Sequence, residues 1–198
     1  MFSKDPCPIL WRKVWITNLI PKINFFWWTA QHGKILTLDN LKKRGFYITN
    51  RCCLCKEKEE SISHLFIECQ FAVGIWTKVW EIFGVAWVMK DNLGQFVENW
   101  DCPFYHPRLV FLWNIVPPYV SWNIWKERNN RIFREESKMV EVVFGIINKL
   151  LKENLRVAKC KMPKEEPGRL EGLVAEKWGC QEDFFLYDNL TRRRRQQK

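Results

Sequence analysis

The sequence lacks any run of about 18 apolar residues, and this absence argues against a transmembrane helix. The opening stretch MFSKDPCPILW also lacks the charged segment and apolar segment of a secretory signal peptide. No lipidation motif ends the chain. We therefore expect an intracellular protein with no membrane partner, whose 8 cysteines are not a secreted disulfide framework.

The aromatic and apolar content of the chain argues against a disordered protein. Hydrophobic residues make up 47% of the 198 positions, and 12 of these are tryptophan, which is enough to build a packed core. Most of the tryptophans recur at helical spacing. We therefore expect their rings to lie in the core and not on a base-stacking surface.

Apolar periodicity and helix-terminating residues predict a mainly α-helical fold. The expected elements are a helix from Pro21 that ends before Gly33, a short helix between Thr37 and Gly45, a helix over about residues 70–83, a mixed segment over 91–107 with a loop at Pro103 and Pro107, a helical stretch over 108–133 broken by Pro117 and Pro118, and a helix capped by Ser137. The last helix carries an apolar stripe from Val140 to Leu155, which we expect to pack on the preceding helix. In an alternative hypothesis this stripe binds a protein partner.

Cysteine and histidine cluster in the segment RCCLCKEKEESISHLFIEC, residues 51–69. Cys52, Cys55, His64 and Cys69 form the pattern C-x2-C-x8-H-x4-C, and short spacings of this kind supply the four tetrahedral ligands of structural Zn²⁺. Cys53 is expected to be a spare thiol. Because four protein ligands leave no open coordination position, the ion would be structural and not catalytic. The alternative is a set of buried free cysteines.

The order of motifs around this segment resembles the zinc-binding region that follows the reverse transcriptase domain in plant non-LTR (LINE-type) retrotransposon polyproteins. The matching pieces are WRKVW, PKINFFWWTAQHGKILTLDNLKKRG, CCLC, EESISHLFIECQFAVGIW and the later WNIWKERNNRIF, over residues 9–135. The resemblance implies the same four zinc ligands. We expect a helical domain with an inserted CCHC zinc-binding loop over residues 50–70. Periodicity and composition further predict an amphipathic helix over 136–160, packed on that domain, and a linker with a basic tail over 161–198.

The chain differs from such polyproteins because it lacks the sequence motifs of their polymerase and RNase H domains. It contains no Tyr/Phe-x-Asp-Asp polymerase motif, and no RNase H carboxylate set follows residue 133. Two-metal nucleotidyl transfer needs clustered carboxylates. We therefore expect a module without enzymatic activity and without a small-molecule substrate.

Basic residues suggest that the partner is RNA or DNA. The net charge is +10, and lysine and arginine bind phosphates without sequence preference. The candidate residues are Lys42, Lys43, Arg44, Arg51, Arg192, Arg193, Arg194 and Arg195. The last four are also typical of a nuclear-import patch, which favours a nuclear location. In the alternative interpretation they are a solvated chain end. The remaining alternatives are a protein-interaction scaffold and a transposon relic without a selected function.

Overall fold

The computed structural model describes residues 19–86, 92–105 and 107–159, and this part of the chain is helical and contains no strand. Its elements are α2 (Pro21–Gln31), α3 (Leu38–Lys43), the π-helix η1 (His64–Glu68), α4 (Gln70–Phe83), α5 (Leu93–Glu98), α6 (Pro107–Phe133) and α7 (Val140–Lys159). The predicted mainly α fold with an inserted Cys/His loop is confirmed. None of these helices has the length and apolar character that a membrane crossing requires.

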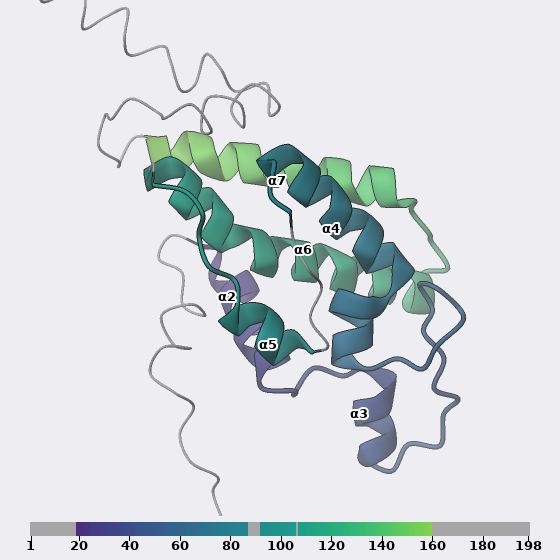
Figure 1. Cartoon of the computed structure of the whole chain (residues 1–198). Coiled ribbons are helices and arrows are strands. Elements are labelled where there is room, and N and C mark those ends of the chain that lie inside the picture. Colours follow the sequence, from purple (N-terminus) through teal and green to yellow (C-terminus); the bar gives the residue numbers. More distant parts are fainter. Residues whose placement is uncertain (1–18, 87–91, 106, 160–198) are drawn as a thin grey trace, which may run out of the picture.

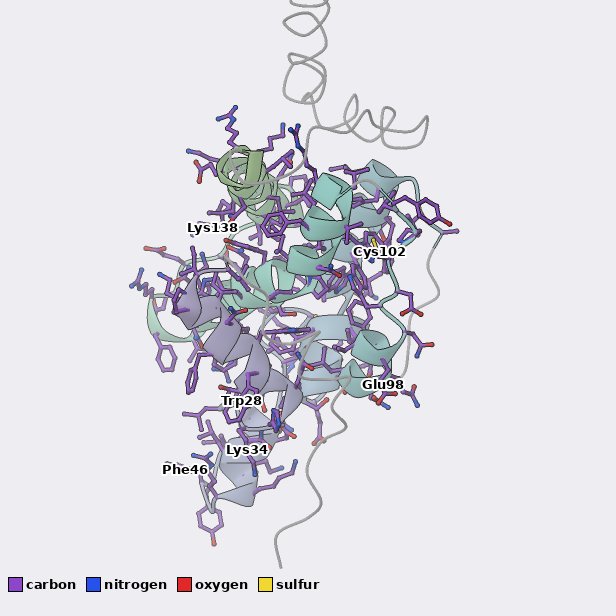
Figure 2. The ribbon with its side chains drawn as sticks, turned by 90° about the vertical axis from the view of Figure 1, so that its left-hand side faces the viewer. Trp28, Lys34, Phe46, Glu98, Cys102 and Lys138 are labelled. Atoms are coloured by element: carbon purple, nitrogen blue, oxygen red, sulfur yellow. The ribbon has the colours of Figure 1, made fainter. Side chains whose placement is uncertain are left out.

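The long helix α6 is the centre of the fold. α7 and α4 contact each other and both contact α6, while α2 also packs on α6 (Figure 1). The rings of Trp27, Trp76 and Trp113 are at most 1% exposed and belong to one core cluster. These three tryptophans therefore lie in the core as predicted. Figure 2 shows Phe46, which follows α3, at the edge of the molecule and far from Lys138 and Cys102.

Local signals placed several helix ends correctly. Pro21 is the first residue of α2, and α4 ends at Phe83 as predicted. Gly33, Gly45 and Gly84 follow helix ends with φ of +68°, +89° and +65°. Glycine adopts this left-handed conformation at low cost, which is why it commonly ends helices.

The prediction of a break at Pro117 and Pro118 is wrong, because α6 runs through both prolines. Pro117 has no N–H to donate to the carbonyl of Trp113, four residues earlier. The indole N–H of Trp100 donates to that carbonyl instead, at 3.0 Å, and the Trp113 indole donates to the carbonyl of Asp101 at 3.0 Å. The two indole rings stack with centroids 4.3 Å apart.

Residues 91–107, which the sequence analysis described as mixed, contain the helix α5, capped by Asn92, whose side chain accepts from the backbone N–H of Gln95. The predicted cap of the last helix at Ser137 is wrong, because α7 begins at Val140. The apolar stripe of α7 is buried in the core, with Val143 and Ile147 at most 3% exposed, and α7 contacts α6 and α4. The surface that the alternative hypothesis offered to a protein partner is therefore covered by the chain's own helices.

Gly145 lies in the middle of α7, is exposed, and has open space around it. A methyl group added there meets no atom within 4 Å. Because alanine is favoured over glycine inside a helix by about 1 kcal/mol, we expect Gly145→Ala to raise the free energy of unfolding by about that amount in urea titrations. Gly74→Ala is the control, since its methyl would lie 3.3 Å from Cγ1 of Val140 and should stabilise less. Equal gains at both positions would contradict this prediction.

Candidate metal centre

A tight turn brings Cys52 and Cys55 together at the start of the Cys/His loop, residues 50–70. The backbone N–H of Lys56 donates to the carbonyl of Cys52, and the N–H of Cys52 donates to the carbonyl of Lys58, both at 2.8 Å. Lys56 adopts a left-handed φ of +59°, which reverses the chain. Arg51 donates through Nε to the Lys56 carbonyl at 2.8 Å. The two cysteines of the C-x2-C pair therefore face one centre.

The π-helix η1 places the other two candidate ligands. The N–H of Cys69 donates to the carbonyl of His64 at 2.7 Å, a bond between residues five apart. In an α-helix, residues five apart point in directions that differ by about 140°. A π-turn brings such residues closer to one face. The H-x4-C spacing therefore suits a π-turn, and periodicity analysis, which assumes α-helical spacing, did not predict it.

The ligand atoms of Cys52, Cys55, His64 and Cys69 all lie within 4.8 Å of one another. Sγ of Cys52 is 4.0 Å from Sγ of Cys69, and Sγ of Cys55 is 3.3 Å from Nε2 of His64. A zinc tetrahedron with Zn–S bonds of about 2.3 Å has S–S edges of roughly 3.8 Å. The spacing of the four atoms therefore fits the size of a zinc site, and Cys52, His64 and Cys69 are buried.

The electrostatics of the cluster already favour a thiolate. The hydrogen bond with Cys69 lowers the pKa of Cys52 to about 4. The same contact, together with burial, raises the pKa of Cys69. One sulfur of this pair is therefore deprotonated at neutral pH, which is the form that binds a divalent metal.

Cys53 lies outside the cluster, as the sequence analysis expected of a spare thiol. Its Sγ approaches the carbonyl of Arg128 on α6 at 3.7 Å. Burial, with smaller effects from Glu60 and Cys52, raises the pKa of Cys53 to about 11. The thiol therefore remains protonated and unreactive at neutral pH.

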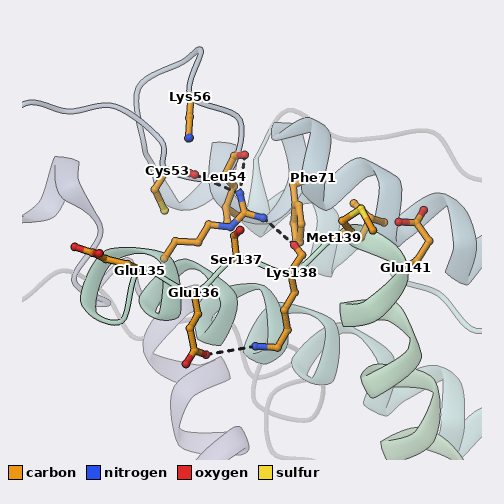
Figure 3. Close-up of a pocket in the computed structure, with 12 residues that line it drawn as sticks. Cys53, Leu54, Lys56, Phe71, Glu135, Glu136, Ser137, Lys138, Met139 and Glu141 are labelled. Carbon is orange, nitrogen blue, oxygen red and sulfur yellow. Dashed lines mark hydrogen bonds and ion pairs between the residues drawn. The ribbon is translucent and has the colours of Figure 1, made fainter.

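Arg131, near the end of α6, ties the cysteine turn to two helices. Its guanidinium donates to the carbonyl of Leu54 at 3.1 Å, to the carbonyl of Lys138 at 2.9 Å and to Oε1 of Glu127 at 2.8 Å. It also lies 4.9 Å from the ring centroid of Phe71 on α4. Figure 3 shows the pocket at this junction, between the cysteine turn and the segment that leads into α7.

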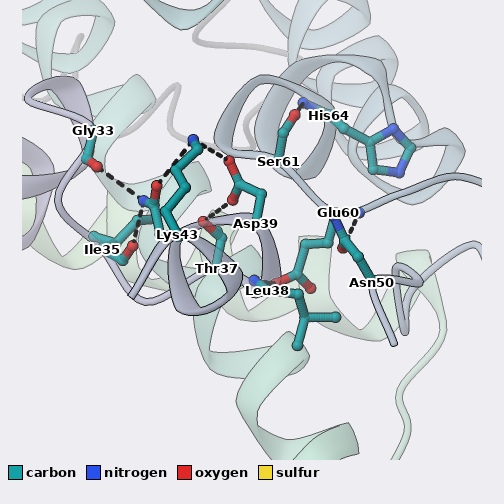
Figure 4. Close-up of polar contacts among 11 residues, drawn as sticks. Gly33, Ile35, Thr37, Leu38, Asp39, Lys43, Asn50, Glu60, Ser61 and His64 are labelled. Carbon is teal, nitrogen blue, oxygen red and sulfur yellow. Dashed lines mark hydrogen bonds and ion pairs between the residues drawn. The ribbon is translucent and has the colours of Figure 1, made fainter. Parts of the chain in front are cut away.

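Glu60 and Arg128 form a buried ion pair that fixes the loop from the other side. The carboxylate is 0% exposed and accepts two bonds from the Arg128 guanidinium, at 2.7 and 3.1 Å. Glu60 Oε1 also accepts the N–H of Leu38 at 2.9 Å, at the start of α3 (Figure 4). The predicted cap of α3, Thr37, donates its hydroxyl to Asp39 and accepts no bond from the helix backbone.

Sequence reasoning missed this polar frame, because Glu60 and Arg128 are 68 positions apart. The available signal was the segment WKERNNRIF, in which Lys126, Glu127, Arg128 and Arg131 lie between large apolar residues on a helix that is otherwise mostly apolar. Such residues commonly need buried partners.

The four predicted nucleic-acid-binding residues at α3 and just before the cysteine turn lie on the surface. Lys42, Lys43, Arg44 and Arg51 are exposed, and Lys43 pairs with Asp39 at 3.0 Å. Arg192, Arg193, Arg194 and Arg195, like the rest of the predicted tail, lie outside the described residues.

Comparison with known proteins agrees with the resemblance seen in the sequence. Residues 1–76 match the family described as zinc-binding in reverse transcriptase. A relative from Arabidopsis thaliana, which carries the name of a ribonuclease H protein, is 25% identical over 134 residues, or 63% of this chain. The chain spans about a fifth of that relative's length (20%). No solved structure shows a significant match. The N-terminal part of the chain is therefore similar to the zinc-binding region of retrotransposon reverse transcriptases.

Proposed function

We propose that Cys52, Cys55, His64 and Cys69 bind one Zn²⁺ ion that stabilises the fold. The observation that supports this most directly is the gathering of their four ligand atoms within 4.8 Å. Bound zinc would cross-link the cysteine turn to η1, and four protein ligands would leave no position for a substrate. Mass spectrometry of protein purified without added zinc tests this proposal, with one zinc ion per chain as the expected result.

The proposed function of the zinc-stabilised module is to bind nucleic acid without catalysing a reaction on it. The matched family belongs to reverse transcriptases, which act on nucleic acid, and the candidate cations Lys42, Lys43, Arg44 and Arg51 are exposed on one continuous segment. Phosphate contacts by such residues give affinity that falls as salt concentration rises. A nuclear location remains a prediction from the composition of the tail.

Fluorescence anisotropy with labelled 20-nucleotide single-stranded RNA and DNA, titrated across salt concentrations, tests this proposal. We expect binding at low salt. The triple variant Lys42→Gln, Lys43→Gln, Arg44→Gln should bind with a weaker salt dependence. The slope of log affinity against log salt should become less negative by about 0.7 for each phosphate contact removed. The control neutralises Lys149 and Lys152 on α7, and should keep the wild-type slope. Absence of binding at low salt would refute the proposal.

A further inference from the structure

Two aromatic side chains project into solvent from the segment between α3 and the cysteine turn. We call residues 42–51 the basic arm. The side chain of Phe46 is 58% exposed and that of Tyr47 is 105% exposed, so neither contributes to the core. Figure 1 shows α3 projecting away from α4, α6 and α7, with the chain that follows it turning back toward α4.

In the part of the chain that the structure describes, most of the positive charge of the basic arm is not paired with a carboxylate. No aspartate or glutamate occurs between Asn40 and Lys56 in the sequence. Asp39, just before this stretch, pairs with Lys43. Among the described residues, no carboxylate pairs with Lys42, Arg44 or Arg51. The two exposed rings are therefore flanked by cations on both sides along the chain.

Backbone and side-chain hydrogen bonds attach the basic arm to α3 and to the buried residue Glu60. The N–H of Phe46 donates to the carbonyl of Leu41 on α3 at 3.2 Å, and Asn50 accepts the N–H of Glu60 at 2.8 Å. Glu60 in turn holds the start of α3 through Leu38. The arm therefore presents its rings from fixed ends, and this lowers the entropy cost of binding.

We propose that Phe46 and Tyr47 stack on unpaired bases of a single-stranded nucleic acid whose phosphates contact Lys42, Arg44 and Arg51. This inference rests on the proposed nucleic-acid function and adds the form of nucleic acid that is bound. Aromatic rings next to a basic groove are the usual means of binding single strands, because every base has a flat face on which a ring can stack. In a duplex those faces are covered by neighbouring base pairs.

The test compares affinities for a labelled 20-nucleotide oligouridine, an oligothymidine of the same length and a 20-base-pair DNA duplex. Tyr47→Ala and Phe46→Ala should each weaken single-strand binding by about five- to 100-fold, and should leave duplex binding and the salt dependence nearly unchanged. Tyr47→Phe keeps the ring and should bind nearly as well as wild type. Tyr105→Ala removes a ring that is 94% exposed elsewhere on the surface and should have no effect. Thermal unfolding checks that each variant is folded.

The outcomes separate this inference from the proposed function. If the wild-type protein binds none of the three probes at low salt, both are refuted. If it binds but Tyr47→Ala and Phe46→Ala match the wild-type affinity for single strands, stacking is refuted and binding through phosphates stands. Equal losses for single strands and duplex would also refute stacking, because a duplex offers no open base face.

Discussion

Replacing Cys55 with serine should release the metal and unfold the loop over residues 50–70. Cys55 supplies one of the four clustered ligand atoms, and structural zinc in small domains contributes apparent binding free energies of about 10–16 kcal/mol. The loop between Cys52 and η1 is short, and its turn relies on a few backbone bonds. We therefore expect less than one zinc ion per chain, a lower helical signal in circular dichroism and a strong drop in the unfolding temperature.

Cys53→Ser is the matched control, because Cys53 lies two positions away and points toward Arg128 and not into the cluster. This variant should retain one zinc ion and most of its helical signal. Chelation of wild-type protein should reproduce the effect of Cys55→Ser, and added Zn²⁺ should reverse it. The ligand assignment would be wrong if Cys53→Ser lost the metal, or if Cys55→Ser kept one zinc ion and the wild-type unfolding temperature.

Features encoded by neighbouring residues were predictable from the sequence. Proline at the start of α2 and glycine after α4 act through their own backbone. The spacing of the candidate ligands likewise follows from the needs of a single ion. Each of these signals spans fewer than about 20 residues, so one sequence is enough to find them.

Features that depend on distant contacts were not predictable. Pro117 indicates a helix break unless another group donates to the carbonyl of Trp113, and that group is the indole of Trp100, 13 positions earlier. The helix α5 is six residues long, too short for a periodic pattern to stand out. The acceptor for the first N–H of α3 is Glu60, a residue of the Cys/His loop, whereas local capping rules pointed to Thr37.

The second large effect is expected at the ion pair between Glu60 and Arg128. Glu60→Ala leaves the Arg128 guanidinium, which is 3% exposed, without its carboxylate partner. It also removes the acceptor for the N–H of Leu38. Breaking one side of a buried ion pair costs about 3–5 kcal/mol. We expect a loss of free energy of unfolding in this range, measured by urea denaturation with saturating zinc so that metal loss does not contribute.

Glu59→Ala is the matched control, since Glu59 is the exposed neighbour of Glu60 and its removal should change the free energy of unfolding by less than about 0.5 kcal/mol. A double variant, Glu60→Leu with Arg128→Met, tests the cause. It is compared with the single variants Glu60→Leu and Arg128→Met. If the cost arises from an unpaired buried charge, replacing both groups with apolar residues should restore part of the stability that either of these single substitutions loses. A double variant as unstable as the sum of the singles would show that Glu60 and Arg128 stabilise the loop independently, through their separate contacts with α3, Asn129 and the ring of Trp125.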